Sequence, residues 1–309
     1  NAALYDLTKD FSFELSNPKF NVIYYKWYSP GPFNDDSSII NSRRWFAIQL
    51  RSYCAQIINP DIVLITSFFE GFVDNCVTEF NHSFNLPPIV SILYDLIPLI
   101  NASSYLSSKE INRFYFHQIN EINKQNGLLA ISKSSLNEAK TYLSISPNQL
   151  FNISSSCDTD IFNLSKENKT DFKDLQFGKF LLYIGAADPR KNLKNLIFAY
   201  SKLDVRSIVK HPLVLAGKFL DAEVDLIYSW MNQSALPKEY VIILGYVSDD
   251  QLSVLYKKCY LFIFPSLHEG FGLPVLEAMN CGAPVIASNA TSIPEIINNS
   301  DFLFDPRDP

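Results

Sequence analysis

The chain has 309 residues, of which 47% are hydrophobic and 19% are charged, and its formal net charge is −6. This length predicts about two domains of ~150 residues each, with enough apolar side chains for two sizeable cores. A negative net charge gives no indication of a nucleic-acid surface, and no apolar run approaches the roughly 20 residues that span a bilayer. The five cysteines lack C-x-x-C spacing, which favours reduced thiols without metal or disulfide roles.

The two ends of the chain bear on where the protein acts. The N-terminal stretch NAALYDLTKDF lacks the basic start and apolar core of a signal peptide, so we expect a cytoplasmic protein. It also lacks a Met, and the chain stops at DFLFDPRDP, directly after a predicted strand. We therefore expect both ends to be truncated and the chain to be part of a longer polypeptide.

Strand-like apolar runs alternate with helical patterns in the first half of the chain, which is the signature of a parallel sheet covered by helices. A helix expected over residues 43–58 separates the first two strands, and Phe46, Leu50, Tyr53 and Ile57 fall on one face of it. We expect this apolar stripe to pack against a core. The strands are predicted at residues 20–25, 61–66, 88–93 and 127–132.

The predicted helix over residues 43–58 also carries Arg43, Arg44, Trp45 and Arg51. Two interpretations of these side chains stay open. They could contact a membrane or a lipid-linked acceptor, which would make the protein membrane-peripheral. Alternatively they form the solvated basic edge of an ordinary core helix, which is the favoured interpretation.

Residues 164–178 are polar and lack periodicity, which predicts a linker between two α/β domains over residues 1–163 and 179–309. A cleft between such domains is the usual place for a ligand. Ser248 and Gln251 have the spacing of a helix capping box in the second domain. Its strands are predicted at 180–185, 212–217, 241–247, 260–266, 284–289 and 301–304, and its helices at 192–203, 221–234, 249–258 and from about 274.

The stretch HEGFGLPVLEAMNCG, residues 268–282, places Glu269 and Glu277 eight positions apart with two glycines and a proline between them. The glycines disfavour a helix, whereas Pro274 suits the first turn of one. We therefore expect Glu269 on a loop and Glu277 in the first turns of a helix. The backbone N–H groups at the start of that helix would attract an anion.

A second signal is YIGAADPRKNLKNLIFAY, residues 183–200, in which a strand ends at Gly185 and a helix begins at about Asn192. Arg190 and Lys191 lie between them, at the carboxyl end of the strand. The helix dipole disfavours cations there, so a compensating anion is expected. The pair is a candidate clamp for a diphosphate, and solvent-facing charge is an equally good interpretation of this motif alone.

Residues 180–306 resemble the nucleotide-binding half of the family 4, or group 1, glycosyltransferases, whose GT-B fold has two Rossmann-like domains facing across a cleft. The matching pieces are, in order, IGAADPRKNL, VLAGK, LGYVSDDQLSVLY, FPSLHEGFGLPVLEAMNCGAPVIASN and PEI. The first half is similar to the acceptor-side domain through LYDLIPL, AISKSS and the SSCDTDIF stretch. Together these pieces predict an α/β protein of the GT-B class.

The resemblance implies retaining transfer of a sugar from a nucleotide-sugar donor, without a metal ion or other cofactor. By position, Arg190 and Lys191 would neutralise the diphosphate leaving group, because fixed cations can stabilise the charge that develops on it. Glu269 would bind hydroxyls of the donor sugar and Glu277 those of the ribose. The implied donor-site residues are Arg190, Lys191, Tyr246, Val247 (both near the base), Glu269, Gly270, Phe271, Gly272, Leu273 and Glu277.

The chain departs from the family in LYDLIPL, where Tyr94 stands at a position that commonly holds a His close to the reacting sugar. Tyrosine can donate a hydrogen bond but carries no charge near neutral pH. Tyr94, Asp95 and Ser132 are the acceptor-side candidates, and Asp95 joins Glu269 and the two cations as a candidate catalytic residue.

Two further groups attract attention for their chemistry. Asp158-Thr159-Asp160 spells the D-x-D metal signature of the other large glycosyltransferase fold, but its place before the linker argues against a metal site. His268 lies beside Glu269, and we expect it to pack or to hydrogen-bond rather than to act as an acid or base.

These observations predict a hexosyltransferase of polysaccharide biosynthesis, with GDP-mannose as the first choice of donor and a glycan or lipid-linked acceptor. A transferase that uses a UDP-hexose is the nearest alternative. A catalytically weak sugar-nucleotide-binding domain of a larger protein is another, favoured by Tyr94, and a GT-B epimerase is a third.

Overall fold

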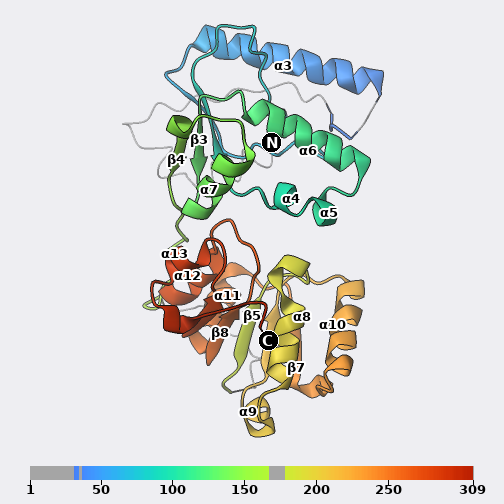
Figure 1. Ribbon diagram of the computed structural model, residues 1–309, viewed down its shortest axis with the longest axis vertical. Helices are drawn as coiled ribbons and strands as arrows, with labels where there is room; N and C mark the ends of the chain where they lie inside the picture. Colours follow the sequence, from blue (N-terminus) through green and yellow to red (C-terminus); the bar gives the residue numbers. More distant parts are fainter. Residues whose placement is uncertain (1–30, 35–36, 167–177, 309) are drawn as a thin grey trace. The chain divides into compact units, whose positions relative to one another are not determined.

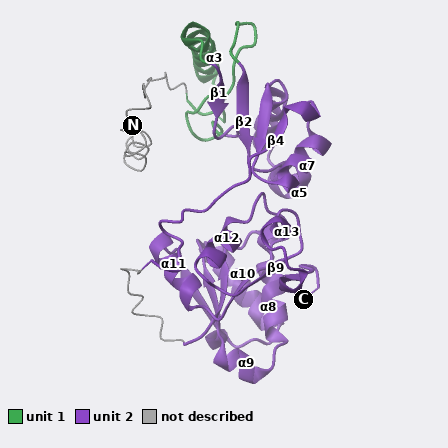
Figure 2. Ribbon diagram, turned by 90° about the vertical axis from the view of Figure 1, so that its left-hand side faces the viewer, with its two compact units in different colours: residues 1–60, 70–87 green, residues 61–69, 88–309 purple. Residues whose placement is uncertain are grey.

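The structure is a computed structural model that describes residues 31–34, 37–166 and 178–308. Its two compact units, which we call unit 1 and unit 2, consist of residues 1–60 with 70–87 and of residues 61–69 with 88–309 (Figure 2). The predicted strand over 20–25 and most of the predicted linker over 164–178 lie outside the described residues.

Unit 1 contains helix α3 (Ser38–Ile58), which begins before the predicted residue 43. The Ser37 side chain accepts a hydrogen bond from the Ile40 backbone N–H at 3.2 Å and caps the helix. At the other end Asn59 adopts a left-handed conformation with φ 48°. Local polar residues therefore set both ends of α3.

The face that α3 buries is not the predicted one. Phe46, Tyr53 and Ile57 are each more than half exposed, so the prediction of a core-facing stripe is wrong. The reason is Arg44, whose buried guanidinium pairs with Glu79 at 3.2 Å (Nη2–Oε1) and turns its own side of the helix inward. The residues that α3 buries are Arg44, Ala47, Ser52 and Ala55.

The basic residues on α3 differ in their burial. Arg44 is buried, and Arg51 donates a hydrogen bond to the Val77 carbonyl while its guanidinium lies 4.3 Å from the Phe80 ring centroid. These two arginines therefore do not form the solvated basic edge that was predicted, whereas Arg43 is exposed and Trp45 is 63% exposed. Across the part of the chain that the structure describes, each helix is too short or too polar to cross a bilayer.

The first sheet of unit 2 is parallel and has the strand order β1-β2-β3-β4. Strands β1, β2 and β3 confirm the strands predicted at residues 61–66, 88–93 and 127–132. No strand was predicted at the position of β4. Ser108 and Ser132 cap its two longest helices, each accepting a hydrogen bond from the backbone N–H three residues later. The elements are β1 (Val63–Ile65), β2 (Ile89–Leu93), α4 (Ile97–Ile100), α5 (Ala102–Tyr105), α6 (Lys109–Ile122), β3 (Gly127–Ala130), α7 (Lys133–Tyr142) and β4 (Leu150–Asn152).

The second sheet of unit 2 is also parallel, in the order β10-β9-β8-β5-β6-β7, and it confirms every strand predicted after residue 179. The capping box of Ser248 and Gln251 is present at the start of α11. The strands are β5 (Leu181–Ile184), β6 (Leu213–Ala216), β7 (Val241–Gly245), β8 (Leu261–Phe264), β9 (Val285–Ser288) and β10 (Leu303–Phe304). The helices are α8 (Leu193–Ser201), α9 (Val205–Lys210), α10 (Asp221–Gln233), α11 (Asp249–Lys258), α12 (Leu273–Asn280) and α13 (Ile293–Ile296).

Alternate residues of the second sheet enter two apolar clusters, one on each face. On β5, Leu181 and Tyr183 pack with residues of α8 and α10, whereas Leu182 packs with residues of α11 and α12. Figure 1 shows α8 beside α10, which agrees with their contacts. Burial on both faces requires strands that are apolar throughout, and the stretch FLLYIG supplies one.

The segment before the predicted linker joins the cluster of α11 and α12. Phe162 is 5% exposed, and its ring packs edge-on against Tyr256 with the centroids 6.1 Å apart. The Ser253 hydroxyl donates a hydrogen bond to the Ile161 carbonyl at 3.1 Å. The chain is therefore attached to the second sheet before it reaches residue 164.

The strand order of the second sheet reverses at β5. From β5 the chain adds β6 and β7 on one side and then returns to place β8 on the other side of β5. In open α/β sheets, ligands bind outside the carboxyl ends of the strands at such a reversal, because the loops that leave the two strands diverge there. The carboxyl ends of β5 and β8 are therefore where a site is expected.

Candidate functional site

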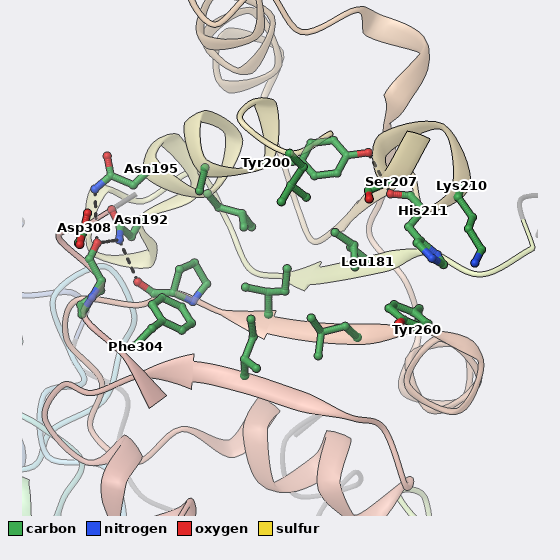
Figure 3. A pocket seen from close by; sticks show the side chains of 18 of the residues that line it. Leu181, Asn192, Asn195, Tyr200, Ser207, Lys210, His211, Tyr260, Phe304 and Asp308 are labelled. Atoms are coloured by element: carbon green, nitrogen blue, oxygen red, sulfur yellow. Dashed lines mark hydrogen bonds between the residues drawn. The ribbon is translucent and has the colours of Figure 1, made fainter. Parts of the chain in front are cut away.

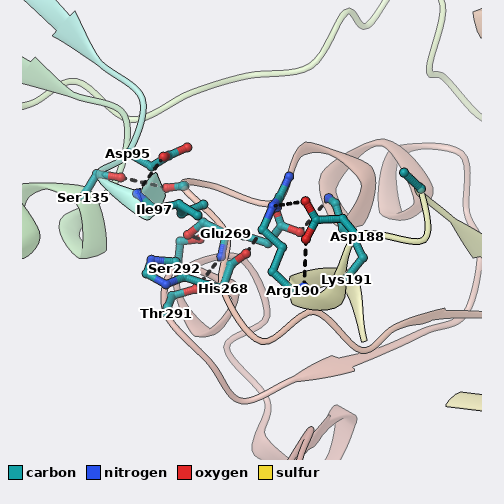
Figure 4. Close-up of polar contacts among 12 residues, drawn as sticks. Asp95, Ile97, Ser135, Asp188, Arg190, Lys191, His268, Glu269, Thr291 and Ser292 are labelled. Atoms are coloured by element: carbon teal, nitrogen blue, oxygen red, sulfur yellow. Dashed lines mark hydrogen bonds and ion pairs between the residues drawn. The ribbon is translucent and has the colours of Figure 1, made fainter. Parts of the chain in front are cut away.

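The loops that leave β5 and β8 carry three of the charged side chains predicted for the site, Arg190, Lys191 and Glu269 (Figure 4). Arg190 and Lys191 lie in one 3₁₀ turn, Pro189–Lys191, directly after β5. The Asp188 carboxylate accepts a hydrogen bond from the Arg190 backbone N–H at 2.8 Å and caps this turn. Proline suits the first position of such a turn, so the sequence DPRK fixes where the two cations stand.

Asn192 holds this turn against the neighbouring strand ends. It has φ 61°, a left-handed conformation that Asn tolerates better than most residues, and it is 6% exposed. Its side-chain amide donates to the carbonyls of Pro265 at 3.0 Å and Pro306 at 2.7 Å. The Leu267 backbone N–H donates to the Arg190 carbonyl at 2.7 Å. One backbone hydrogen bond and one from the Asn192 side chain thus join the loops after β5 and β8.

Glu269 brings the predicted charges together. Its Oε2 lies 3.1 Å from Arg190 Nη1, and its Oε1 lies 2.6 Å from Lys191 Nζ. Arg190 Nε also lies 3.6 Å from Asp188 Oδ2. The compensating anion expected beside the two cations is therefore supplied by the chain itself, in two carboxylates that match two cations.

The pKa of Arg190 reflects this arrangement. Burial acts to lower it, but the negative charges of Glu269 and then Asp188 outweigh burial and raise the pKa above its ordinary value. Arg190 therefore stays charged at any physiological pH, as arginine side chains do in proteins.

The backbone of Glu269 is anchored by a third loop, which follows β9. The Glu269 N–H donates to Thr291 Oγ1 at 3.0 Å, and the buried Ser292 hydroxyl donates to the Glu269 carbonyl at 3.0 Å. The loop after β9 thus fixes the backbone of Glu269, and the turn after β5 contacts its carboxylate, so the residue is positioned before any ligand arrives. Such preorganisation is what electrostatic catalysis requires.

The two glycines of EGFG allow close approaches that a side chain would block. A Cβ on Gly270 would lie 2.5 Å from the Tyr94 carbonyl oxygen. Gly272 has φ 109°, and a Cβ there would lie 2.5 Å from Ile293 Cδ1. Gly272 precedes α12, whose first residues are Leu273 and Pro274, so the predicted change from loop to helix is confirmed.

Glu277 lies in the second turn of α12, in a different environment from Glu269. Its Oε2 accepts a hydrogen bond from the Tyr256 hydroxyl at 3.1 Å. Burial raises the pKa of its carboxyl above the ordinary value, and the hydrogen bond from Tyr256 opposes this rise. The carboxylate is therefore held by a neutral donor rather than by a cation.

The acceptor-side candidates follow strands of the first sheet. Asp95 is partly buried, which raises the pKa of its carboxyl, and its Oδ1 accepts a hydrogen bond from the Ile97 N–H at 2.9 Å. Ser132 is 1% exposed and spends its hydroxyl on capping α7, accepting from the Ser135 N–H at 2.9 Å. Tyr94 is half exposed. Of the three, Asp95 and Tyr94 keep polar atoms suited to a ligand.

His268 confirms the hydrogen-bonding role predicted for it. Its Nε2 lies 2.7 Å from Glu138 Oε1, and Glu138 also accepts a hydrogen bond from the Leu96 N–H at 3.2 Å. Because Leu96 follows Asp95 in the chain, this glutamate connects the loop that carries Glu269 to the loop after β2.

The remaining donor-site candidates differ in exposure. Tyr246, directly after β7, is 78% exposed, whereas Val247 packs partly against the cluster of α11 and α12. Phe271 is buried, and Leu273 is 37% exposed at the start of α12. Tyr246 therefore presents most of its ring to solvent.

The D-x-D stretch shapes a turn. Asp158 Oδ1 accepts a hydrogen bond from the Asp160 N–H at 2.8 Å, and the Asp158 carbonyl accepts one from the Phe162 N–H at 2.8 Å. Asp158 therefore helps to insert Phe162 into its cluster. In the ranges that the structure describes, no three His, Cys, Asp or Glu side chains are grouped so that they could hold a metal ion.

Several polar contacts of the site have no counterpart in the sequence analysis. The Tyr105 hydroxyl donates to both Asp188 oxygens, at 2.8 and 3.0 Å, and burial together with this bond raises the pKa of Tyr105 to about 12. Glu295 accepts hydrogen bonds from the N–H groups of Lys133 and Ser134, both at 2.8 Å. Only Asp188 had a local signal, because Asp followed by Pro is typical of a capped turn.

A pocket of about 740 Å³ lies elsewhere on the second sheet (Figure 3). Apolar side chains such as Leu181, Leu196 and Ile263 line it, and Asn192 lies at one of its borders. None of the four charged candidates of the donor site lines this pocket. It is therefore separate from the predicted chemistry.

Comparison with known proteins agrees with the resemblance. Residues 166–309 match the family described as "Glycosyl transferases group 1". The serotype-specific mannosyltransferase WbdA of Escherichia coli is 38% identical over 256 residues, which are 81% of this chain and 31% of that protein. The O-antigen chain mannosyltransferase B of the same species is 40% identical over 129 residues, which are 42% of this chain and 33% of that protein. The chain thus spans about a third of the length of these two relatives.

A structural likeness defines the class of the fold. The sucrose-phosphate synthase of Thermosynechococcus elongatus superposes with a TM-score of 0.65 over 87% of this chain and 66% of that one, at 17% identity. Together with the two parallel sheets, this confirms an α/β protein with the GT-B fold. Within that class the chain belongs to the group 1 glycosyltransferases.

Proposed function

We propose that this chain forms the catalytic part of a retaining, metal-independent hexosyltransferase that moves mannose from GDP-mannose to a glycan or lipid-linked acceptor of a surface polysaccharide. Family membership supports sugar transfer from a nucleotide donor. The names of the two mannosyltransferase relatives support mannose and a serotype-determining or O-antigen product. Retention and the guanine base rest on the family resemblance of the sequence motifs.

One observation carries the proposal: a single carboxylate, Glu269, stands between Arg190 and Lys191 at the strand-order reversal of the second sheet. A surface pair of cations would have no reason to converge there. The side chains of Lys191 and Glu269 are 15% and 10% exposed, so their charges lie in a region of reduced dielectric. Electrostatic effects on a bound anion are stronger there than in water.

The diphosphate of the donor would replace Glu269 as the partner of the two cations. It carries more than one negative charge, and the planar guanidinium of Arg190 can bind two of its oxygens at once. Glu269 would then release its oxygens to hydroxyls of the donor sugar, which lies next to the diphosphate. When the bond between the sugar and the diphosphate breaks, Arg190 and Lys191 would stabilise the charge that forms on the leaving group.

Asp95 is the proposed acceptor-side residue. Burial raises the pKa of its carboxyl, so it holds a proton more readily than an exposed aspartate. A hydroxyl acceptor must lose a proton during transfer, and a carboxylate with a raised pKa is a better base for it. Asp95 would therefore orient the acceptor hydroxyl and accept its proton as the new bond to the sugar forms.

Nucleotide binding tests the first part of the proposal. We expect GDP to raise the melting temperature of the protein more than UDP or ADP does, because a ligand that binds the folded state stabilises it by mass action. A larger shift with UDP would replace mannose with a UDP-hexose as the donor sugar. Absence of a shift with all three nucleotides would refute both sugar transfer and nucleotide binding.

Turnover of the donor tests the second part. We expect Glu269→Ala to lower the hydrolysis or transfer of GDP-mannose about 10²- to 10³-fold, as loss of one preorganised partner typically does. Glu239→Ala, which changes an exposed glutamate in the same half of unit 2, should leave the rate unchanged. Equal rates in wild type and Glu269→Ala would remove Glu269 from the site.

A second candidate function is a sugar-nucleotide-binding domain without efficient transfer. The observation in its favour is Tyr94, which is half exposed where the family commonly carries a histidine. This candidate predicts a thermal shift with a nucleotide but no turnover of GDP-mannose or UDP-hexoses. Restoring the family residue with Tyr94→His should then raise turnover from that baseline.

A further inference from the structure

The proposed function leaves one buried hydroxyl beside the donor site without a role. Tyr256 of α11 is fully buried, yet its hydroxyl reaches the neighbouring helix α12 and donates to Glu277 Oε2 at 3.1 Å. A buried tyrosine hydroxyl needs a partner, and a backbone carbonyl is the common one. Here the partner is a carboxylate to which the proposed function gives a ligand.

Aromatic neighbours fix the position of the Tyr256 hydroxyl. The ring packs edge-on against Phe262 of β8, with centroids 5.2 Å apart and planes at 79°, and against Phe162, at 6.1 Å and 65°. Both geometries are favourable for aromatic pairs. Because the ring is held from two sides, its hydroxyl is a rigid donor rather than an adaptable one.

The burial of Tyr256 also keeps its hydroxyl in the donating state. Burial, followed by the nearby charge of Glu277, raises the pKa of Tyr256 well above its ordinary value, so the hydroxyl keeps its proton. Tyr256 can therefore donate to Glu277 throughout the working pH range. Among the described residues, Oε1 of Glu277 has no hydrogen-bond partner, whereas Oε2 has Tyr256.

We propose that Tyr256 is a positioning residue: it holds Oε2 of Glu277 so that Oε1 accepts a hydrogen bond from a ribose hydroxyl of the donor nucleotide. This inference rests on the proposed function, in which Glu277 binds the ribose. Tyr256 would thereby contribute to specificity. With Oε2 of Glu277 held in place, Oε1 favours a ligand that has a hydroxyl at the position of the ribose hydroxyl. Without Tyr256, Glu277 could rotate away and the preference for ribose would weaken.

Nucleotides with and without ribose hydroxyls test the inference. Calorimetric titration of the wild type should give about 10- to 100-fold tighter binding of GDP than of 2′,3′-dideoxy-GDP, as expected for a hydrogen bond to a charged group. Tyr256→Phe should reduce this ratio about three- to tenfold, by weakening GDP and leaving the dideoxy nucleotide unchanged. UDP and 2′,3′-dideoxy-UDP serve in the same way if the thermal shifts favour uridine.

Two further variants separate positioning from general loss of packing. Tyr200→Phe removes another buried tyrosine hydroxyl, bonded to the His211 carbonyl at 3.0 Å, and should keep the wild-type ratio. Glu277→Gln should lose the preference for ribose, and Tyr256→Phe combined with it should lower the ratio no further, since the two residues act as one unit.

The outcomes distinguish the inference from the proposed function. If Glu277→Gln loses the preference and Tyr256→Phe keeps it, the positioning role is overturned and the ribose role of Glu277 stands. If the wild type binds both nucleotides of a pair equally well, the ribose role and the positioning role fall together, while sugar transfer is still decided by the turnover of GDP-mannose. An equal weakening of both nucleotides by Tyr256→Phe would show a structural effect and overturn the inference.

Discussion

Glu269 and Glu277 come from one stretch of fifteen residues, yet the fold gives them opposite electrostatic surroundings. Glu269 is bonded to two cations, whereas Glu277 is partly buried beside a neutral tyrosine, and this burial raises its pKa. The stretch itself sets only the boundary between loop and helix at Gly272. The partners come from other strands and helices, so the spacing of a motif does not determine the chemistry of its members.

The largest loss of stability is expected from Gly272→Ala, which alters the residue between the loop of Glu269 and helix α12. The variant combines a strained φ of 109° with a contact of 2.5 Å to Ile293, and strain and overpacking each typically cost about 1–3 kcal/mol. Urea denaturation should therefore show a loss of about 2–5 kcal/mol. Gly245→Ala isolates the effect of φ, since Gly245 has φ 75° and open space around its Cβ position, and it should lose only about 1–2 kcal/mol. Equal losses would show that the contact with Ile293 is unimportant.

Lys191→Ala removes one of the two cations that contact Glu269. Titration should show GDP affinity reduced about 10- to 100-fold, because a hydrogen bond to a charged group is lost. Lys194→Ala, at an exposed position on the adjoining helix α8, is the matched control and should bind as the wild type does. A diphosphate that binds both variants equally would be held by groups other than Lys191.

Tyr105→Phe tests the outer support of the same ionic cluster. The variant deletes the hydroxyl that donates to both Asp188 oxygens and should cost about 1 kcal/mol of unfolding free energy. Asp188 would still cap the turn, so nucleotide affinity should fall by less than in Lys191→Ala. An affinity loss as large as that of Lys191→Ala would mean that Tyr105 determines where Arg190 points.

Glu277→Gln tests the surroundings of Glu277 through the sign of a small change in the free energy of unfolding. Because the folded-state pKa of Glu277 is raised, its charged form opposes folding at neutral pH, and wild-type stability from this group is recovered as the pH falls. The variant should therefore be at least as stable as wild type at pH 7, with its advantage shrinking toward pH 4.5, the ordinary value of the group. Urea denaturation at both pH values checks this. A larger advantage in acid would contradict the raised pKa.

The alternation of strands and helices was predictable because it depends on the local periodicity of apolar residues. The strands of the second sheet confirm this, since each is an apolar run bounded by turn residues. The buried face of α3 was not predictable in the same way. Arg44 is buried because Glu79, 35 residues later, pairs with it. The periodicity of apolar residues within the helix cannot predict a partner at that distance along the chain.

The charged residues of the candidate site were predictable for a related reason. Arg190, Lys191 and Glu269 lie in short motifs at strand ends, where parallel sheets gather their functional groups. The residues that position them were not, because they act across the fold. Tyr256 precedes Glu277 by 21 positions and looks in the sequence like any core aromatic residue of an amphipathic helix.

The insertion of Phe162 among the residues of α11 and α12 affects where the chain can be divided. The family match begins at residue 166, so a fragment chosen by that boundary would lack the ring that shields one side of Tyr256. Water would then reach a hydroxyl whose orientation depends on dry aromatic walls. A fragment intended to bind nucleotide by itself should therefore begin before Cys157. It would then contain the whole turn that places Phe162 against α11 and α12.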